Sequence, residues 1–181
     1  MPEELFITSY NEATKRHAVL QDDGLTAWLF LHRPSDDRRH TAAVERACFI
    51  YNRKAAISAG DVKKYRPKPP PIAKGYATEF AVTEDPFHYR WILEWSKSGE
   101  AVLLTRDGQP WCVVEVNGTS NYGYCKSIKA EGPWGSPWDQ QRFDGLRWGG
   151  PQDGGVDGGQ PFSSVSNHCS AAAASPRSPL R

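Results

Sequence analysis

The stretch over residues 91–116 constrains the fold most, because it alternates short apolar runs with tight polar turns. The apolar runs are WILEW, EAVLL and PWCVVEV, and the segments SKSG and TRDGQ separate them. Short apolar runs joined by tight turns are typical of an antiparallel β-meander. The sequence therefore predicts a β domain built around this meander.

The second turn of the meander sets a register. Asp107-Gly108 predicts a two-residue type I′ turn, which needs a positive φ at both central positions. Counting outward from this turn pairs Arg106 with Gln109 and Leu104 with Trp111. Alternation then predicts one face with Val102, Leu104, Trp111 and Val113, and another with Ala101, Leu103, Cys112, Val114 and Val116. Both faces are apolar, so we expect the hairpin to be covered on both sides.

Apolar and polar patterning elsewhere predicts the remaining elements. We expect strands at 5–10, 17–20, 25–32, about 44–52, 75–82 and 122–128, a helical turn at 58–65, and extended polyproline at 67–72. The predicted fold is mostly β: antiparallel meanders forming a sandwich or partly open barrel, with at most one or two short helices. An α+β fold is the alternative, because AAVERA at 42–47 is also compatible with a helix start.

Composition predicts one domain followed by a tail. We place a single mostly β domain at 1–143, with a weak internal duplication of a hairpin unit as one interpretation of the similar words AVLQDDG and AVLLTRDG. Residues 144–181 are rich in Gly, Ser, Ala and Pro and poor in apolar residues, so we expect disorder there. An abrupt change of this kind also fits a frameshifted end.

Charge and cysteine content limit the partners and the compartment. The chain has 22 basic and 21 acidic residues and a formal net charge of +1. This balance argues against a nucleic-acid or anionic membrane partner. No apolar run approaches the roughly 20 residues of a membrane span, and the N-terminus has no secretory signal pattern. Cys48, Cys112, Cys125 and Cys169 are widely spaced, which favours buried free thiols and a cytoplasmic location.

Local motifs give no specific chemistry. One loop carries His32, Asp36, Asp37 and His40, but three interleaved arginines favour a self-paired charged loop over a metal site. Cys112 with His88 would be a nucleophile–base pair, but the apolar neighbours of Cys112 favour an inert thiol. We therefore expect no catalytic residue, metal or cofactor to be identifiable from this sequence.

Two aromatic segments are candidates for partner binding. Trp134 and Trp138 lie in the Gly/Pro-rich segment EGPWGSPW, where a tryptophan either anchors a partner or plugs the open end of a sheet. The basic proline-rich stretch at 63–76 could dock on an SH3-like groove. It lacks a basic residue at the required offset from its PxxP, so a structural crossover is the favoured interpretation.

The ordered motifs of 17–138 resemble a family of uncharacterised bacterial proteins, domain-of-unknown-function family 2251. The matching words are the DDG hairpin at 22–24, IYN at 50–52, WSKSG at 95–99 and GYC at 123–125. The chain departs from the family pattern at 26–28 and at 110–111. The resemblance implies a bacterial, cytoplasmic, single-domain protein, and it brings no catalytic residue because the family has no assigned activity.

Two classes of function are compatible with these observations. The first is a non-enzymatic protein-binding module, such as an immunity or accessory protein, with another protein as its partner. The alternative is a small enzyme with a dispersed acid–base site drawn from His32, His88, Asp22 and Asp23. The absence of a local catalytic motif and the abundance of aromatic residues favour binding.

Overall fold

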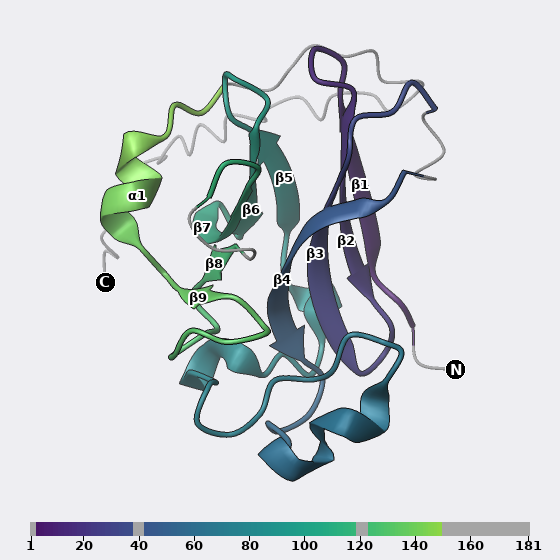
Figure 1. The fold of residues 1–181 in the computed structure, drawn as a ribbon. Helices are drawn as coiled ribbons and strands as arrows, with labels where there is room; N and C mark the ends of the chain where they lie inside the picture. Colours follow the sequence, from purple (N-terminus) through teal and green to yellow (C-terminus); the bar gives the residue numbers. More distant parts are fainter. Residues whose placement is uncertain (1–2, 38–41, 119–122, 150–181) are drawn as a thin grey trace, which may run out of the picture.

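The protein folds as two β-sheets packed against each other (Figure 1). The computed structural model describes residues 3–37, 42–118 and 123–149. The first sheet has the antiparallel order β1 (Phe6–Asn11), β2 (Arg16–Asp22), β3 (Thr26–His32) and β4 (Val44–Asn52). The second has the order β5 (Trp91–Trp95), β6 (Ala101–Arg106), β7 (Gln109–Glu115), β8 (Tyr124–Cys125) and β9 (Ser136–Pro137), and only its β8–β9 pair is parallel. The mostly β, sandwich-like prediction is confirmed.

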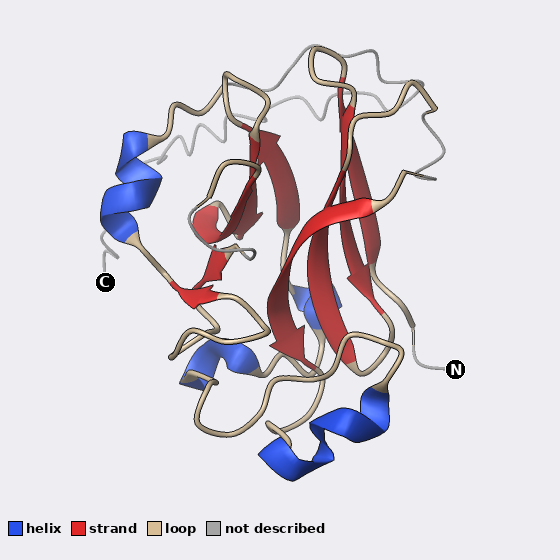
Figure 2. Cartoon of the chain, in the orientation of Figure 1, coloured by secondary structure: helices blue, strands red, loops and turns tan. Residues whose placement is uncertain are grey.

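The helical segments are short and lie outside the sheets (Figure 2). They are the 3₁₀-helices η1 (Ala59–Tyr65), η2 (Glu79–Ala81) and η3 (Pro86–His88), and the α-helix α1 (Gln140–Gly145). The strand predicted at 75–82 is wrong, because the Thr78 hydroxyl accepts from the Phe80 N–H and begins η2 there. The strand predicted at 122–128 is reduced to β8.

No helix in 3–37, 42–118 or 123–149 has the length and apolar character needed to cross a membrane.

Alternating side chains from the two sheets form one core. Each sheet contributes a small apolar set: Ala18, Leu20, Leu29 and Leu31 from the first, and Val102, Leu104, Cys112 and Val114 from the second. On its other side the second sheet carries a smaller cluster, which Trp138, Phe143, Leu146 and Trp148 cover. The second sheet is therefore buried on both faces, as the apolar meander predicts.

The domain extends past its predicted end at Phe143. Trp148 forms an isolated antiparallel β-bridge with Ser96, and the Gly149 N–H donates to the Trp95 carbonyl at 3.2 Å. Leu146 and Trp148 are held in the cluster over the second sheet. Residues 144–149 therefore pack on the domain although the predicted tail begins at 144, and the rest of that tail, 150–181, falls outside the described residues.

The hairpin between β6 and β7 has the predicted turn, but the predicted register holds only next to it. Arg106 pairs with Gln109 and Thr105 with Pro110, after which a shift pairs Leu104 with Cys112. One extra residue of β7, Trp111, is inserted here as a bulge. Cys112 therefore faces the main core beside Leu104, and the two predicted faces are wrong beyond the bulge.

Gly108→Val should cost about 1–3 kcal/mol of unfolding free energy, because Gly108 has φ of 76° and β-branched residues avoid that region. A Cβ at this position would meet no atom within 4 Å, so the loss would come from the backbone alone. Gly108→Asn is the matched control, since Asn tolerates positive φ. Urea unfolding measures both, and an equal stability of the two variants would contradict the type I′ turn.

Candidate functional site

The outer face of the first sheet, turned away from the second sheet, carries the candidate site. Leu20, Leu29 and Leu31 point into the core, so their neighbours in β2 and β3 point outward. The outward set includes Val19, Gln21, Trp28 and Phe30, which oppose one another across the two strands. Helix α1 lies on the opposite side of the molecule, against the second sheet (Figure 1).

An apolar groove crosses this outer face. It has a volume of about 260 Å³ and is lined by Phe6, Val19, Gln21, Phe30, His32 and Val44. Phe6 on β1 is 58% exposed and Val44 on β4 is 49% exposed, so the groove is flanked by large apolar side chains that water reaches. Exposed apolar side chains that lie next to one another often mark an interaction surface.

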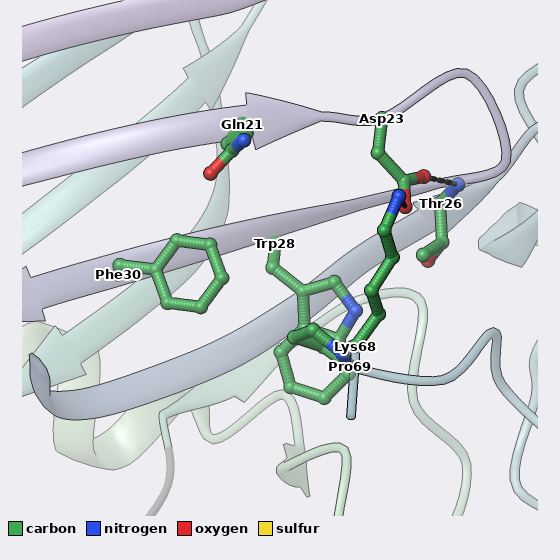
Figure 3. Close-up of a pocket in the computed structure, with 7 residues that line it drawn as sticks. All are labelled: Gln21, Asp23, Thr26, Trp28, Phe30, Lys68 and Pro69. Carbon is green, nitrogen blue, oxygen red and sulfur yellow. Dashed lines mark hydrogen bonds and ion pairs between the residues drawn. The ribbon is translucent and has the colours of Figure 1, made fainter. Parts of the chain in front are cut away.

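A smaller pocket adjoins the apolar groove and shares Gln21 and Phe30 with it (Figure 3). This Trp28 pocket has a volume of about 130 Å³ and is lined by Gln21, Asp23, Thr26, Trp28, Phe30, Lys68 and Pro69. The Trp28 indole is 6% exposed and stacks with Phe30 at 6.5 Å between ring centroids. Its Nε1–H is buried and has no hydrogen-bond acceptor among the residues that the structure describes.

The charged groups at the mouth of the Trp28 pocket are paired with each other. Asp23 Oδ1 accepts from the N–H groups of Leu25 and Thr26, both at 3.1 Å. Asp23 Oδ2 lies 3.7 Å from the Lys68 ammonium, whose side chain is 71% exposed. The Thr26 hydroxyl donates to the Tyr51 carbonyl at 3.1 Å. The mouth of the pocket therefore carries no net charge.

A buried ionic network holds the β2–β3 hairpin that forms this pocket. Asp22 is fully buried and accepts from the Gly24 N–H at 2.8 Å, the Tyr51 hydroxyl at 2.8 Å and Arg53 Nε at 2.6 Å. Burial, followed by the neighbouring Asp22 carboxylate, raises the pKa of Tyr51 well above its usual value. Tyr51 therefore stays a hydrogen-bond donor to Asp22, and Asp23 is held at the pocket mouth.

The structure separates the two tryptophans predicted to bind a partner. Trp134 is 3% exposed in the main core, and its Nε1–H donates to the Pro70 and Pro71 carbonyls. Trp138 is half-buried over the second sheet and donates to Gln140 Oε1 at 2.9 Å. Their partner-binding role stays a prediction, although little of the Trp134 side chain is left for a partner to contact.

The same contacts define the role of the proline-rich segment. Trp134 hydrogen-bonds the backbone of Pro70 and Pro71, and the following Ile72 and Ala73 are buried in the main core. The stretch at 63–76 therefore belongs to the connection that leads from β4 of the first sheet to β5 of the second.

The acid–base candidates are spread over the molecule. Asp22 and Asp23 lie at one end of β3 and His32 lies at the other, a span of about 20 Å for a strand of this length. The His88 side chain is 79% exposed on η3 and pairs with Asp85 at 3.0 Å. Within the ranges that the structure describes, no cluster of three His, Cys, Asp or Glu is placed to hold a metal ion. His40 lies outside those ranges.

The cysteines that the structure describes are buried and free, as the sequence predicts. Cys48, Cys112 and Cys125 all lie in the core. Burial raises the pKa of the Cys48 and Cys112 thiols, so neither is activated as a nucleophile. Cys169 lies outside the described residues.

Sequence reasoning missed the residues of this outer face. The run TAWLFLH at 26–32 is apolar at successive positions, so both faces of β3 carry large apolar side chains. Such a run in an antiparallel sheet indicates a second covered or contacted face, which is the signal that could have identified Trp28 and Phe30.

The fold and the site define a class: a mostly β domain with an apolar groove and an aromatic pocket on one open sheet face. Comparison of the chain with protein-family models, curated proteins and solved structures found no match in any of the three. The resemblance to family 2251 stays a prediction based on the motifs of 17–138.

Proposed function

We propose that this chain is a non-enzymatic protein-binding module that engages its partner through the outer face of the first sheet. The partner presents a protruding aliphatic or aromatic side chain, which enters the apolar groove between Phe6 and Val44. With the family resemblance, this role would be that of an immunity or accessory protein in the bacterial cytoplasm.

The observation that supports the proposal is the unequal covering of the two sheets. The far face of the second sheet is packed beneath Trp138, Phe143 and Trp148. The outer face of the first sheet instead keeps Phe6 and Val44 about half exposed beside an open groove. Exposing such side chains is unfavourable in water, and a partner's apolar side chain would remove them from water.

The geometry gives the enzyme alternative no comparable support. The dispersed site would need His32, His88, Asp22 and Asp23 to act together, and Asp22 is already committed to Tyr51 and Arg53. His32 Nδ1 is bonded to the Ala42 carbonyl at 2.7 Å, at the far end of the strand from the aspartates.

Photo-crosslinking from the groove tests the proposal in the source cell. The photoreactive amino acid p-benzoylphenylalanine replaces Phe6, which tolerates the change because it is 58% exposed. Mass spectrometry identifies the trapped partner, and calorimetry then compares the purified partner's affinity for wild type and for Phe6→Ser/Val44→Ser. We expect the double variant to bind at least about tenfold more weakly, or about 1.4 kcal/mol.

A control variant separates groove binding from general surface stickiness. Phe80 is 50% exposed on η2, close to the exposure of Phe6, and it does not line the groove. Phe80→Ser should leave the affinity unchanged. An equal affinity for wild type and the groove variant, or an equal loss with Phe80→Ser, would reject the groove as the binding surface.

A further inference from the structure

We infer that the Trp28 pocket is a binding site for an uncharged amide, whose carbonyl oxygen accepts from Trp28 Nε1 and whose apolar part packs against the apolar lining of the pocket. This assignment rests on the Trp28 pocket and not on the apolar groove. The amide site can therefore fail its test while the proposed protein-binding function stands, and the protein-binding function can fail while the amide site stands. It concerns a different ligand chemistry from the apolar groove, although the two hollows adjoin.

The unpartnered indole nitrogen provides the first argument. Trp28 is more than nine-tenths buried, yet its Nε1–H has no acceptor among the described residues. A buried donor without an acceptor is unfavourable, and native proteins usually satisfy such groups with a partner or a bound molecule. The indole edge with this nitrogen faces the Lys68 side chain in Figure 3, on the side away from Phe30. A carbonyl oxygen entering the pocket here would supply the missing acceptor.

The charge of the pocket provides the second argument. Its one carboxylate, on Asp23, already accepts two backbone hydrogen bonds and faces the Lys68 ammonium at 3.7 Å. A charged ligand would compete with this pair and would also lose its own hydration on entering. An amide avoids both costs and still offers the acceptor that Trp28 needs. The exposed Gln21 in the wall can donate to or accept from the rest of such a ligand.

Access to the indole nitrogen depends on Lys68. The Lys68 side chain runs from the 68–69 segment toward Asp23 along one wall of the pocket (Figure 3). It is 71% exposed and is held by the long pair with Asp23, so the side chain can swing outward at small cost. This movement opens the covered Nε1–H without any change in the sheet.

Three probes with one carbon skeleton test the ligand class: isovaleramide, isovalerate and isoamylamine. A ¹⁵N-correlated spectrum of the full chain resolves the indole N–H signals, and Trp28→Phe assigns the Trp28 signal. If that variant fails to fold, Lys68→Ala assigns it by perturbing the neighbouring indole. We expect isovaleramide to move the Trp28 signal downfield, with a midpoint about tenfold below those of the charged probes.

Other tryptophans of the chain supply internal controls. Trp111 and Trp148 also have buried Nε1–H groups that find no partner within the described ranges, but neither residue lines this pocket. Their signals should stay in place. A Trp28 signal that no probe moves, or that isovalerate or isoamylamine moves at a lower concentration than isovaleramide, would overturn the assignment.

A fourth probe separates the two sources of an amide. N-acetyl-leucyl-glutaminamide carries the group as part of a peptide. A midpoint about tenfold below that of isovaleramide assigns the pocket to a segment of a partner protein. An equal or higher midpoint assigns it to a free small molecule.

Discussion

Asp22→Ala should lower the unfolding free energy by about 3–5 kcal/mol, because it removes one partner of a buried ion pair. The substitution leaves the guanidinium of Arg53, whose side chain is only 12% exposed, without its carboxylate. It also removes the acceptor of the buried Tyr51 hydroxyl and of the Gly24 N–H. Urea unfolding of wild type and variant measures the loss.

The adjacent aspartate is the matched control. Asp23→Ala removes turn hydrogen bonds to Leu25 and Thr26 at the solvent-facing tip and should cost about 1 kcal/mol. The double variant Asp22→Ala/Arg53→Met removes both charges. Its loss of unfolding free energy should be about 1–3 kcal/mol smaller than the sum of the losses of the single variants Asp22→Ala and Arg53→Met. Strictly additive losses, or equal losses for Asp22 and Asp23, would contradict the buried network.

Strands and turns could be predicted because their signals are local. The β4 strand begins and ends at the predicted residues, Val44 and Asn52, since CFIY is rich in strand-forming side chains. The turn at Asp107-Gly108 has positive φ at both positions, 51° and 76°, as its dipeptide requires. Each of these predictions needed only neighbouring residues.

Features that depend on contacts distant in sequence were not predicted. The register of β7 shifts by one residue beyond Pro110, and this inserted residue reverses the faces of Cys112 and Val113, which counting outward from the turn did not anticipate. The end of the domain depends on Trp148 docking beside Ser96, which lies far earlier in the chain. Composition alone placed that boundary too early.

The candidate site needs the fold before it can be recognised. Phe6, Phe30 and Lys68 lie far apart in the sequence, and none belongs to a chemical motif. The DDG hairpin at 22–24 forms a turn in which Asp22 and Asp23 accept from the backbone N–H groups of Gly24, Leu25 and Thr26. The same turn also holds Asp23 and Lys68 at the mouth of the Trp28 pocket. Only the sheet pairing brings Gln21 opposite Trp28.

Trp134→Ala should cost about 3–5 kcal/mol of unfolding free energy, because it opens a large cavity in the main core. Trp134 packs against Tyr76 at 5.0 Å between ring centroids and holds the 70–71 backbone through its indole N–H. Its own carbonyl accepts from the Phe49 N–H at 2.8 Å, so the segment is tied to β4. Calorimetric or urea unfolding measures the loss.

Trp138→Ala provides the comparison, since both residues come from the same EGPWGSPW segment. Trp138 is half-buried and its N–H bonds an exposed Gln140, so we expect a loss of about 1 kcal/mol. A large loss at Trp134 together with a small one at Trp138 means that Trp134 is a plug of the sandwich. A small loss of stability in both variants would contradict the core packing of Trp134. It would instead favour Trp134 as an anchor for a partner.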